Sequence, residues 1–536
     1  MSYTTFAFAL FVCVTVAVYY LFPVKKYQWT VLLAASYFFY CFAAWRYVFF
    51  ILFSTFTIWL AGLYLQKLAE KQKATIKAHR KEWSKDEKKV YKKKMHSKLV
   101  AILAITLIVN FGILGFLKYY NFMAGGLNQL FGGDPLPILN LFLPLGISFY
   151  TFQATGYLID VYRETIQAEK NPIKFALFIS FFPQIIQGPI SQFAQLGEQL
   201  FTPHRPEYAR FKYGLELILW GVFKKLIIAD RAAVLIKTVT ADYTAYTGTT
   251  LFATALLYAL QLYADFSAGI DISRGIAKIL GIDMVLNFRQ PYFSKSINEY
   301  WRRWHITLGV WMKNYIFYSL AMSDGFLNMS RKLKNTKFGQ TKAGAHFAKV
   351  FPTSIASFVV FLAVGVWHGA NSRYIAFGVW NGLIIMISIL LKPVFEKMIA
   401  ALRINAASFG WRLFQMIRTF ILVLVGYYFD IGPNFKGAMD MMRLSIVDQH
   451  AHAGIHELLN LGLGEKDFAA ILFGMIVIWV ISIRLEKTGI ETPGELIGKR
   501  RAWVQWIFLF LAVIVIIVLG RYGPGYDPAE FVYMQF

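Results

Sequence analysis

Long apolar runs separated by short polar stretches follow one another along most of this chain. A bilayer core about 30 Å thick needs roughly 20 apolar residues for one helical span. Runs of this kind begin near Phe6, Trp29, Tyr47, Leu99, Ile173, Phe211, Leu251, Ser354, Tyr374, Trp411, Phe468 and Trp503. Shorter or interrupted apolar pieces lie at 137–160 and 306–320. The pattern predicts an all-α polytopic membrane protein with about 11 to 13 membrane helices, re-entrant segments included.

The amino-acid composition agrees with this interpretation. Of the 536 residues, 57% are hydrophobic and only 16% are charged, whereas a soluble domain has about 25% charged residues. Such a chain cannot bury its apolar surface in one soluble core, so the bilayer must act as its solvent. We therefore predict a single membrane domain over residues 1–536.

The net charge of +25 is unevenly distributed along the chain. Much of it lies in the segment 66–98, between two apolar runs. A basic excess in a short segment beside membrane spans marks the cytoplasmic side and requires no nucleic acid. We predict a basic cytoplasmic loop at 66–98, folded as a helical hairpin. Three spans before it put the N-terminus outside.

Two apolar segments contain residues that interrupt a helix. Pro144 and Gly146 lie in the first, and Pro183, Gly188 and Pro189 lie in the second. Broken backbone at membrane depth is tolerated where protein or a wet cavity satisfies its polar groups. For each segment taken alone, a proline kink that helps the helices pack is as good an explanation as a cavity. The two segments together favour a protein with a cavity. The two halves of the chain show no matching pair of interrupted helices, which weighs against a transporter built from inverted repeats.

His368 ends the apolar run that starts near Ser354, within the stretch VGVWHGAN at 365–372. A titratable ring at membrane depth is costly and commonly functional. The alternative is a helix end at Gly369, with the imidazole bonded to a carbonyl.

His305 lies in the aromatic segment FSKSINEYWRRWHITLGVWMKNYIFY at 293–318. Ser296 and Glu299 form a capping-box pattern that predicts a helix start. In one helix His305 shares a face with Trp301, Trp304, Leu308 and Met312. Arg302 and Arg303 point away from this face, towards headgroups or an anionic substrate. A basic interfacial helix with a satisfied histidine is the alternative. Because an imidazole titrates near pH 6.5, both histidines are candidates for proton transfer at neutral pH.

Other motifs give little support for further chemistry. His450, His452 and His456 lie near Asp448, but no second ligand cluster accompanies them, so we predict no metal site. No P-loop, G-x-G-x-x-G, G-x-S-x-G or HExxH sequence is present.

Several ordered motifs resemble those of the membrane-bound O-acyltransferase (MBOAT) family. They are most similar to its bacterial branch that acylates cell-surface polymers, which includes the alginate O-acetylation and teichoic-acid D-alanyl transfer proteins. The motifs are the segments 143–163, 180–193, 260–282, 300–317 and 365–372, and the closing EFVYMQF at 530–536 is also similar. Two departures from the family pattern are DFSAGID at 265–271 and Asp430, where related proteins tend to have arginine.

The resemblance implies a ring of helices around a central tunnel, with the catalytic region at 290–370. It assigns catalysis to His368 and His305, and we add Trp304, Trp367, Arg302, Arg303 and Asp265 as candidate substrate contacts. A thioester donor, acetyl-CoA or an acyl-carrier protein, would arrive from the cytoplasm, and no cofactor would be bound. His368 would take the proton of an acceptor hydroxyl, and His305 would orient the acyl group, stabilise the oxyanion or relay the proton.

The expected function is therefore transfer of an acyl group, most simply acetyl, across the bacterial cytoplasmic membrane. The acceptor would be a cell-surface polysaccharide or an extracytoplasmic acyltransferase partner. Alternatives within the family are D-alanyl transfer to teichoic acid and acylation of a lipid or a protein. A transporter or channel is the alternative from another class, but it leaves the pairing of WHG and WRRWH unexplained.

Overall fold

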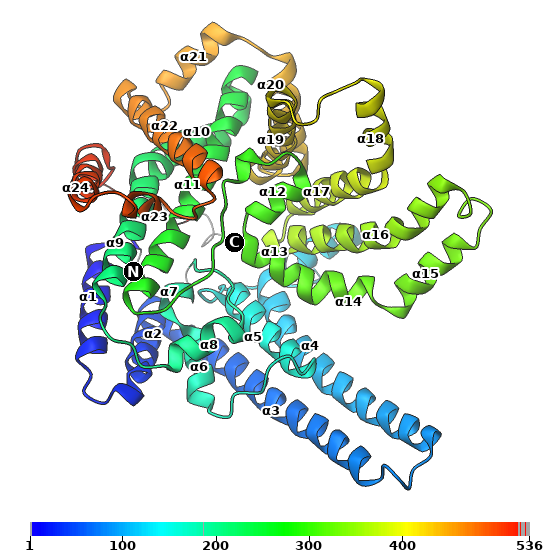
Figure 1. Ribbon diagram of the computed structural model, residues 1–536. Helices are drawn as coiled ribbons and strands as arrows, with labels where there is room; N and C mark the ends of the chain where they lie inside the picture. Colours follow the sequence, from blue (N-terminus) through cyan, green and yellow to red (C-terminus); the bar gives the residue numbers. More distant parts are fainter. Residues whose placement is uncertain (1–2, 134, 186, 524–525, 527–530, 532–536) are drawn as a thin grey trace. The chain divides into compact units, whose positions relative to one another are not determined.

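The computed structural model describes residues 3–133, 135–185, 187–523, 526 and 531, and every regular element in these ranges is a helix (Figure 1). Eight of the described helices are long and apolar enough to cross a membrane. They span Trp45–Ala78, Lys85–Phe131, Gly248–Ile279, Lys342–His368, Ser372–Leu390, Phe409–Ile431, Glu465–Thr488 and Ala502–Leu519. The predicted all-α polytopic fold is confirmed.

The described residues form two compact units, Met1–Leu215 with Ser273–Val285, and Glu216–Ile272 with Leu286–Phe536. The prediction of a single membrane domain over 1–536 stays a prediction. The closing EFVYMQF motif lies outside the described residues, apart from Phe531.

The first unit contains the helices of the N-terminal third. They are α1 (Phe6–Leu21), α2 (Trp29–Ala44), α3 (Val48–Ala78), α4 (Lys85–Phe131), α5 (Ile147–Tyr162), α6 (Pro172–Ser180), α7 (Phe182–Ile185) and α8 (Phe193–Phe201). Two helices belong partly to each unit, α9 (Tyr208–Phe223) and α11 (Gly248–Ile279).

The second unit contains the remaining helices, which carry both histidines of interest. They are α10 (Asp230–Ala241), α12 (Ile297–Arg303), α13 (Ile306–Met312), α14 (Tyr318–Ala321), α15 (Asp324–Lys334), α16 (Lys342–His368), α17 (Ser372–Leu390), α18 (Lys392–Ala401), α19 (Phe409–Ile431), α20 (Phe435–Val447), α21 (Ala451–Leu459), α22 (Glu465–Thr488), α23 (Pro493–Gly498) and α24 (Ala502–Leu519). Two π-helical turns, Lys224–Ala229 and Lys313–Phe317, follow α9 and α13.

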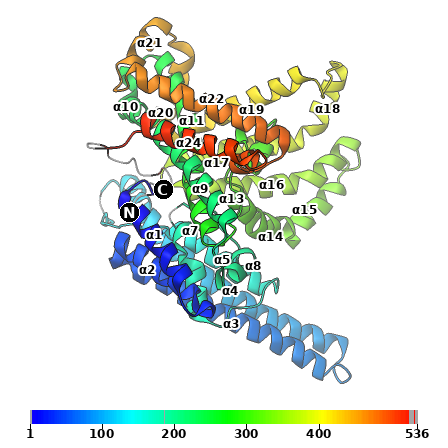
Figure 2. The same ribbon diagram turned by 60° about the vertical axis from the view of Figure 1, so that its left-hand side comes forward.

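The basic segment 66–98 forms the tip of a helical hairpin made by α3 and α4, as both views show (Figures 1 and 2). Ser84 caps the start of α4 by accepting a hydrogen bond from the backbone N–H of Glu87, whose carboxylate accepts one from the Ser84 N–H. This reciprocal cap satisfies two backbone donors that the first helical turn leaves unpaired. The hairpin prediction is confirmed.

The apolar run that begins near Ile173 does not form a full span. The helix α6 ends at Ser180, and α7 starts only after Phe181. A continuous helix here would bring the ring of Pro183 against the carbonyl of the residue four positions earlier, and Pro183 has no N–H to donate. The run is therefore two short helices, which corrects the expectation of one span.

The helices α16 and α17 form a tightly packed hairpin. A Cβ on Gly365 would lie 2.4 Å from the carbonyl oxygen of Tyr374, and one on Gly378 would lie 2.5 Å from that of Phe361. Glycine is required at both positions because the two backbones approach too closely for any side chain. This packing fixes the end of α16, where His368 lies.

Candidate active site

His368 is the last residue of α16, and its local sequence explains its position. Gly369 follows it, and a Cβ there would lie 2.6 Å from the ring of Tyr374. Asn371 then caps α17, because its side chain accepts a hydrogen bond from the backbone N–H of Arg373. The chain therefore turns sharply from one helix into the next, and His368 lies at the turn.

Aromatic rings surround the imidazole of His368. Its centroid lies 5.1 Å from the ring of Trp367, 5.2 Å from that of Phe377 and 6.0 Å from that of Tyr374, to which it is nearly parallel. These contacts limit the orientations that the imidazole can adopt.

The segment around His305 is two helices rather than one. The helix α12 ends at Arg303, α13 begins at Ile306, and His305 between them has a left-handed backbone with φ +46°. Such a conformation costs a non-glycine residue about 1–3 kcal/mol and persists only where its surroundings enforce it. The expected single helical face shared by Trp301 and His305 is therefore wrong, although the predicted cap by Ser296 is present.

Asn287 enforces this break. Its backbone carbonyl accepts a hydrogen bond from the N–H of Ile306, at 3.0 Å. Its side-chain oxygen accepts three more, from the Thr307 N–H at 3.0 Å, the Thr307 hydroxyl at 2.9 Å and Nδ1 of His305 at 3.3 Å. Asn287 and His305 are 0% and 2% exposed, so water does not compete for these bonds.

This network fixes the tautomer of His305. The backbone N–H of Thr307 can only donate, so the Asn287 atom that faces it must be the amide oxygen rather than the nitrogen. That oxygen can only accept, so Nδ1 of His305 must carry a proton. In the neutral ring the lone pair then lies on Nε2, which makes His305 a potential proton acceptor.

The two histidines are linked through Trp367. The Trp367 ring lies 6.1 Å from that of His305 and 5.1 Å from that of His368. Phe266 packs edge-on against His305 at 4.9 Å. The two predicted catalytic residues, 63 positions apart in sequence, thus both lie close to one buried indole.

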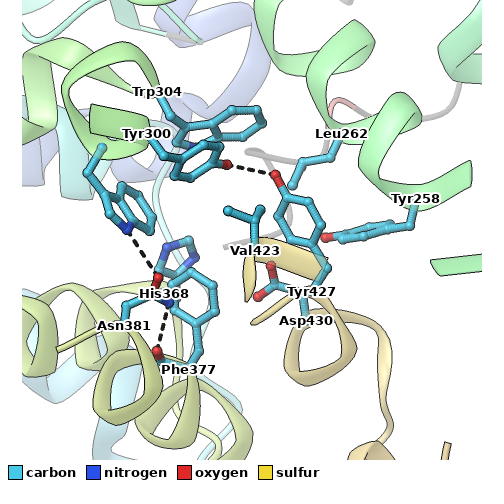
Figure 3. Close-up of a pocket in the computed structure, with 11 residues that line it drawn as sticks. Tyr258, Leu262, Tyr300, Trp304, His368, Phe377, Asn381, Val423, Tyr427 and Asp430 are labelled. Carbon is cyan, nitrogen blue, oxygen red and sulfur yellow. Dashed lines mark hydrogen bonds between the residues drawn. The ribbon is translucent and has the colours of Figure 1, made fainter. Parts of the chain in front are cut away.

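A narrow pocket borders His368, and we call it the His368 pocket (Figure 3). Its lining comes from α11, α12, α16, α17 and α19. The residues are Tyr258, Leu262, Tyr300, Trp301, Trp304, His368, Phe377, Asn381, Val423, Tyr427 and Asp430. In Figure 3 the carboxylate of Asp430 and the ring of His368 face each other across this space.

A chain of hydroxyl groups with a fixed direction runs along one wall of the His368 pocket. Tyr292 donates to the carbonyl of Ala259 at 2.6 Å, so its oxygen must accept from Tyr427 at 3.1 Å. Tyr427 has then used its only proton and accepts from Tyr300 at 2.7 Å. Linked hydrogen bonds of this kind polarise one another and hold the rings in place.

A larger space of about 560 Å³, which we call the His305 cavity, borders His305. Its walls are mostly apolar and come from α12, α13, the π-helical turn after α13, α16 and α17. They include Trp301, Ile306, Leu308, Met312, Phe317, Val360, Phe361, Val364, Ile385 and Ile389. Two exposed cations, Arg302 and Lys313, also line it. Because Trp301 lines this cavity and the His368 pocket alike, its side chain is a wall common to both.

The candidate substrate contacts have different surroundings. Trp304 lines the His368 pocket, and the ring of Trp367 lies close to both histidines. Arg302 lines the His305 cavity, on the same side as His305, contrary to the expectation that it points away. The substrate roles of all three stay predictions.

Arg303 and Asp265 are engaged in ion pairs. Arg303 donates to Glu486 at 2.7 and 2.9 Å and to Glu299 at 2.7 Å. Asp265 accepts from Lys225 at 2.7 Å, and Lys225 also pairs with Asp230 at 2.9 Å. These contacts give both residues a structural role, and their proposed contact with substrate stays a prediction.

Sequence reasoning missed Asn287 and the tyrosine chain. Asn287 lies 18 positions before His305, in a segment without helical periodicity, so no spacing connects the two. No group of three or more His, Cys, Asp or Glu side chains within the described ranges is arranged to hold a metal ion.

The chain is similar to known proteins. Residues 167–336 match the model of the membrane-bound O-acyltransferase family, MBOAT. A protein of Pseudomonas aeruginosa described as probable alginate O-acetylase AlgI is 33% identical over 81% of this chain and 72% of its own length. The protein of the same description from Pseudomonas putida is 30% identical over 98% of both chains. The peptidoglycan O-acetyltransferase of Helicobacter pylori is 32% identical over 52% of this chain and 54% of its own length.

Proposed function

Because this chain belongs to the membrane-bound O-acyltransferase family, we propose that it transfers an acetyl group from a thioester donor to a hydroxyl group of a polysaccharide. One observation carries the proposal at the level of the site. His305 and His368 both lie close to the Trp367 ring, and each borders its own space, one suited to a donor and the other to an acceptor.

The His305 cavity fits a thioester donor. Its mostly apolar walls suit a thin acyl-bearing arm, and Arg302 and Lys313 can bind phosphate groups attached to the outer end of that arm. Acetyl-CoA and an acyl-carrier protein both offer a phosphate joined to such an arm. Mostly apolar walls of this kind also help to keep water away from the thioester.

The distribution of cations supports opposite entry sides for donor and acceptor. The connection from α16 to α17, beside His368, contains no charged residue at 369–371. The opposite ends of these helices carry many cations. Arg331, Lys332, Lys334 and Lys337 lie before α16, Lys342 is its first residue, and Lys392, Lys397 and Arg403 follow α17. Since positive residues favour the cytoplasmic side, the end with His368 faces outwards. We infer a bacterial cytoplasmic membrane, with the N-terminus outside.

The transfer follows from these positions. The acceptor oxygen attacks the thioester carbonyl carbon while His368 takes the hydroxyl proton. A C–O bond forms, the C–S bond breaks, and the proton ends on the sulfur of the departing thiol. The tautomer that Asn287 imposes makes Nε2 of His305 a proton acceptor, which favours a relay role for His305 over donation to the oxyanion.

Labelled acetyl-CoA and the purified full-length protein test this proposal. We expect the label to appear on an added oligosaccharide or, where a partner completes the transfer, on an extracytoplasmic acyltransferase. His368→Ala should abolish labelling while the protein remains folded and inserted, and the exposed His452→Ala serves as the matched control. Full acetylation by the His368→Ala variant would refute the assignment. Passage of a solute without use of the donor would instead indicate a transporter.

A further inference from the structure

The His368 pocket contains a carboxylate that the transfer step described above does not use. Asp430, the next-to-last residue of α19, lines the pocket together with Tyr258 and Tyr427. Its Oδ1 atom is buried and accepts no hydrogen bond from the described residues. Burying a carboxylate oxygen without a hydrogen-bond donor raises the free energy of the folded protein, because the hydrogen bonds to water are lost and none replaces them. Such a group in a pocket indicates a ligand that supplies the donor.

Arg373 acts electrostatically on Asp430, but the hydrogen bonds described for its guanidinium go to other groups. The guanidinium of Arg373 donates to the carbonyl of Gly432 and to the hydroxyl of Tyr374. It also lies over the Tyr374 ring, 4.8 Å from its centroid. Arg373 is thus held beside the pocket, and no lysine or arginine is among the described residues that line it.

The rest of the pocket wall is aromatic. Tyr258 and Tyr427 meet edge to face at 5.6 Å, and Tyr300 and Trp304 stack at 5.7 Å. Ring faces pack well against the C–H faces of a sugar, while a carboxylate accepts hydrogen bonds from its hydroxyl groups. The tyrosine hydroxyl chain is already committed internally, whereas Oδ1 of Asp430 is an acceptor that no described donor occupies.

We propose that the His368 pocket binds an uncharged polyhydroxyl acceptor through two neighbouring hydroxyl groups, one bonded to His368 and the other to Asp430. The proposal rests on the proposed function and names the acceptor class. The hydroxyl at His368 is the one that is acetylated, and the one at Asp430 orients the sugar. A carboxylate on the acceptor would meet the charge of Asp430 without a lining cation to offset it, so a polyuronate is a poor acceptor.

The experiment compares a neutral acceptor with a counterpart that carries a carboxylate in place of each C6 hydroxymethyl group. Cellohexaose and its C6-carboxylated counterpart are offered to the full-length protein with labelled acetyl-CoA, and kcat/KM is measured for each. We expect the wild-type protein to prefer the neutral hexamer by at least about tenfold. Asp430→Asn should raise KM for the neutral hexamer roughly tenfold, which corresponds to the loss of one hydrogen bond to a charged group. Asp430→Glu, which keeps the charge, should recover part of the preference.

Asp324→Asn is the matched control, because it removes an exposed carboxylate at the start of α15. It should leave both acceptors unaffected. A wild-type protein that acetylates the carboxylated hexamer as well as the neutral one overturns the inference. So does an Asp430→Asn variant that lowers kcat equally for both acceptors, because that result assigns Asp430 to the chemistry instead.

Two further results separate the inference from the proposed function. If neither hexamer is acetylated while intact cells still acetylate their surface polysaccharide through His368, the inference is wrong and the proposed function stands. If acetyl-CoA is not consumed under any condition, in cells or with the purified protein, the proposed function itself fails.

Discussion

The two spaces beside the histidines differ in size and charge. The His305 cavity holds about 560 Å³, is mostly apolar and has two exposed cations in its lining. The His368 pocket is narrow and lined mostly by aromatic side chains, and its charged lining group is Asp430. A thioester with a distant phosphate matches the first space and a hydroxyl group matches the second. The difference suggests that donor and acceptor specificity are encoded by separate residues.

The two imidazoles are also held in different ways. Hydrogen bonds from Asn287 and a left-handed backbone fix His305, whereas aromatic packing surrounds His368. The first arrangement determines which nitrogen carries the proton, and the second limits the orientation of the ring. Substitutions on each side should therefore change different steps of the reaction.

The largest effect is expected for His368→Ala. Loss of a general base lowers the rate of transfer by about 10²–10⁴-fold. Acetylation of the acceptor by the purified variant measures this loss, and binding of acetyl-CoA should persist because His368 does not line the His305 cavity. Loss of donor binding together with activity would show that the two spaces are not independent. His452→Ala serves as the control.

Asn287→Ala should follow, with transfer reduced about 10–100-fold, as is typical when a group that orients a catalytic ligand is removed. Without the amide oxygen, His305 loses the partner that fixes its tautomer and the left-handed turn loses a side-chain bond. Asn287→Asp keeps an acceptor at this position and should restore much of kcat and shift the pH profile. If Asn287→Asp is as inactive as Asn287→Ala although both are folded, the tautomer argument is wrong.

Trp301→Ala should increase hydrolysis of the acetyl donor relative to transfer, while donor binding stays unchanged. The indole lines both spaces, and its nitrogen donates to Asn381 at 3.1 Å. Its removal joins the two spaces and admits water to the thioester. We expect a several-fold rise in acetyl-CoA hydrolysis relative to transfer, measured as free thiol against acetylated acceptor. An unchanged ratio would mean that Trp301 is not a barrier.

The smallest effect is expected for the cations of the His305 cavity. An exposed ion pair contributes about 0.2–1 kcal/mol, so Arg302→Gln with Lys313→Gln should raise KM for acetyl-CoA roughly two- to tenfold. The increase should shrink at high salt because exposed charges are screened. KM for the acceptor should stay constant, and Lys397→Gln on α18 is the control. An effect confined to the acceptor would reverse the assignment of the two spaces.

Much of the fold follows from the sequence because the bilayer imposes a simple rule. Apolar runs near Leu99, Ser354 and Trp411 form helices, since every backbone polar group must be bonded within the lipid. The run at Ile173 is different, because Pro183 ends the helix before a full span is complete.

The candidate site is predictable only in part. VGVWHGAN identifies His368, and its glycines have visible packing reasons. The break at His305 has no glycine or proline to signal it, because the hydrogen bonds of the distant Asn287 create it. Arg302 and Arg303 are neighbours with the same chemistry, but Arg302 lines the His305 cavity, whereas Glu299 and Glu486 bind Arg303. Tertiary partners of this kind are not encoded in any local spacing.

The central claim is that donor and acceptor reach the two histidines from opposite sides of one membrane. Proteoliposomes with the full-length protein in a known orientation test it, with labelled acetyl-CoA supplied only on the face of α15 and cellohexaose only on the face of the α16–α17 connection. The account predicts acetylated cellohexaose in this arrangement, and none when the two compounds exchange sides. Equal labelling in both arrangements, or labelling only when donor and acceptor share one side, would contradict it.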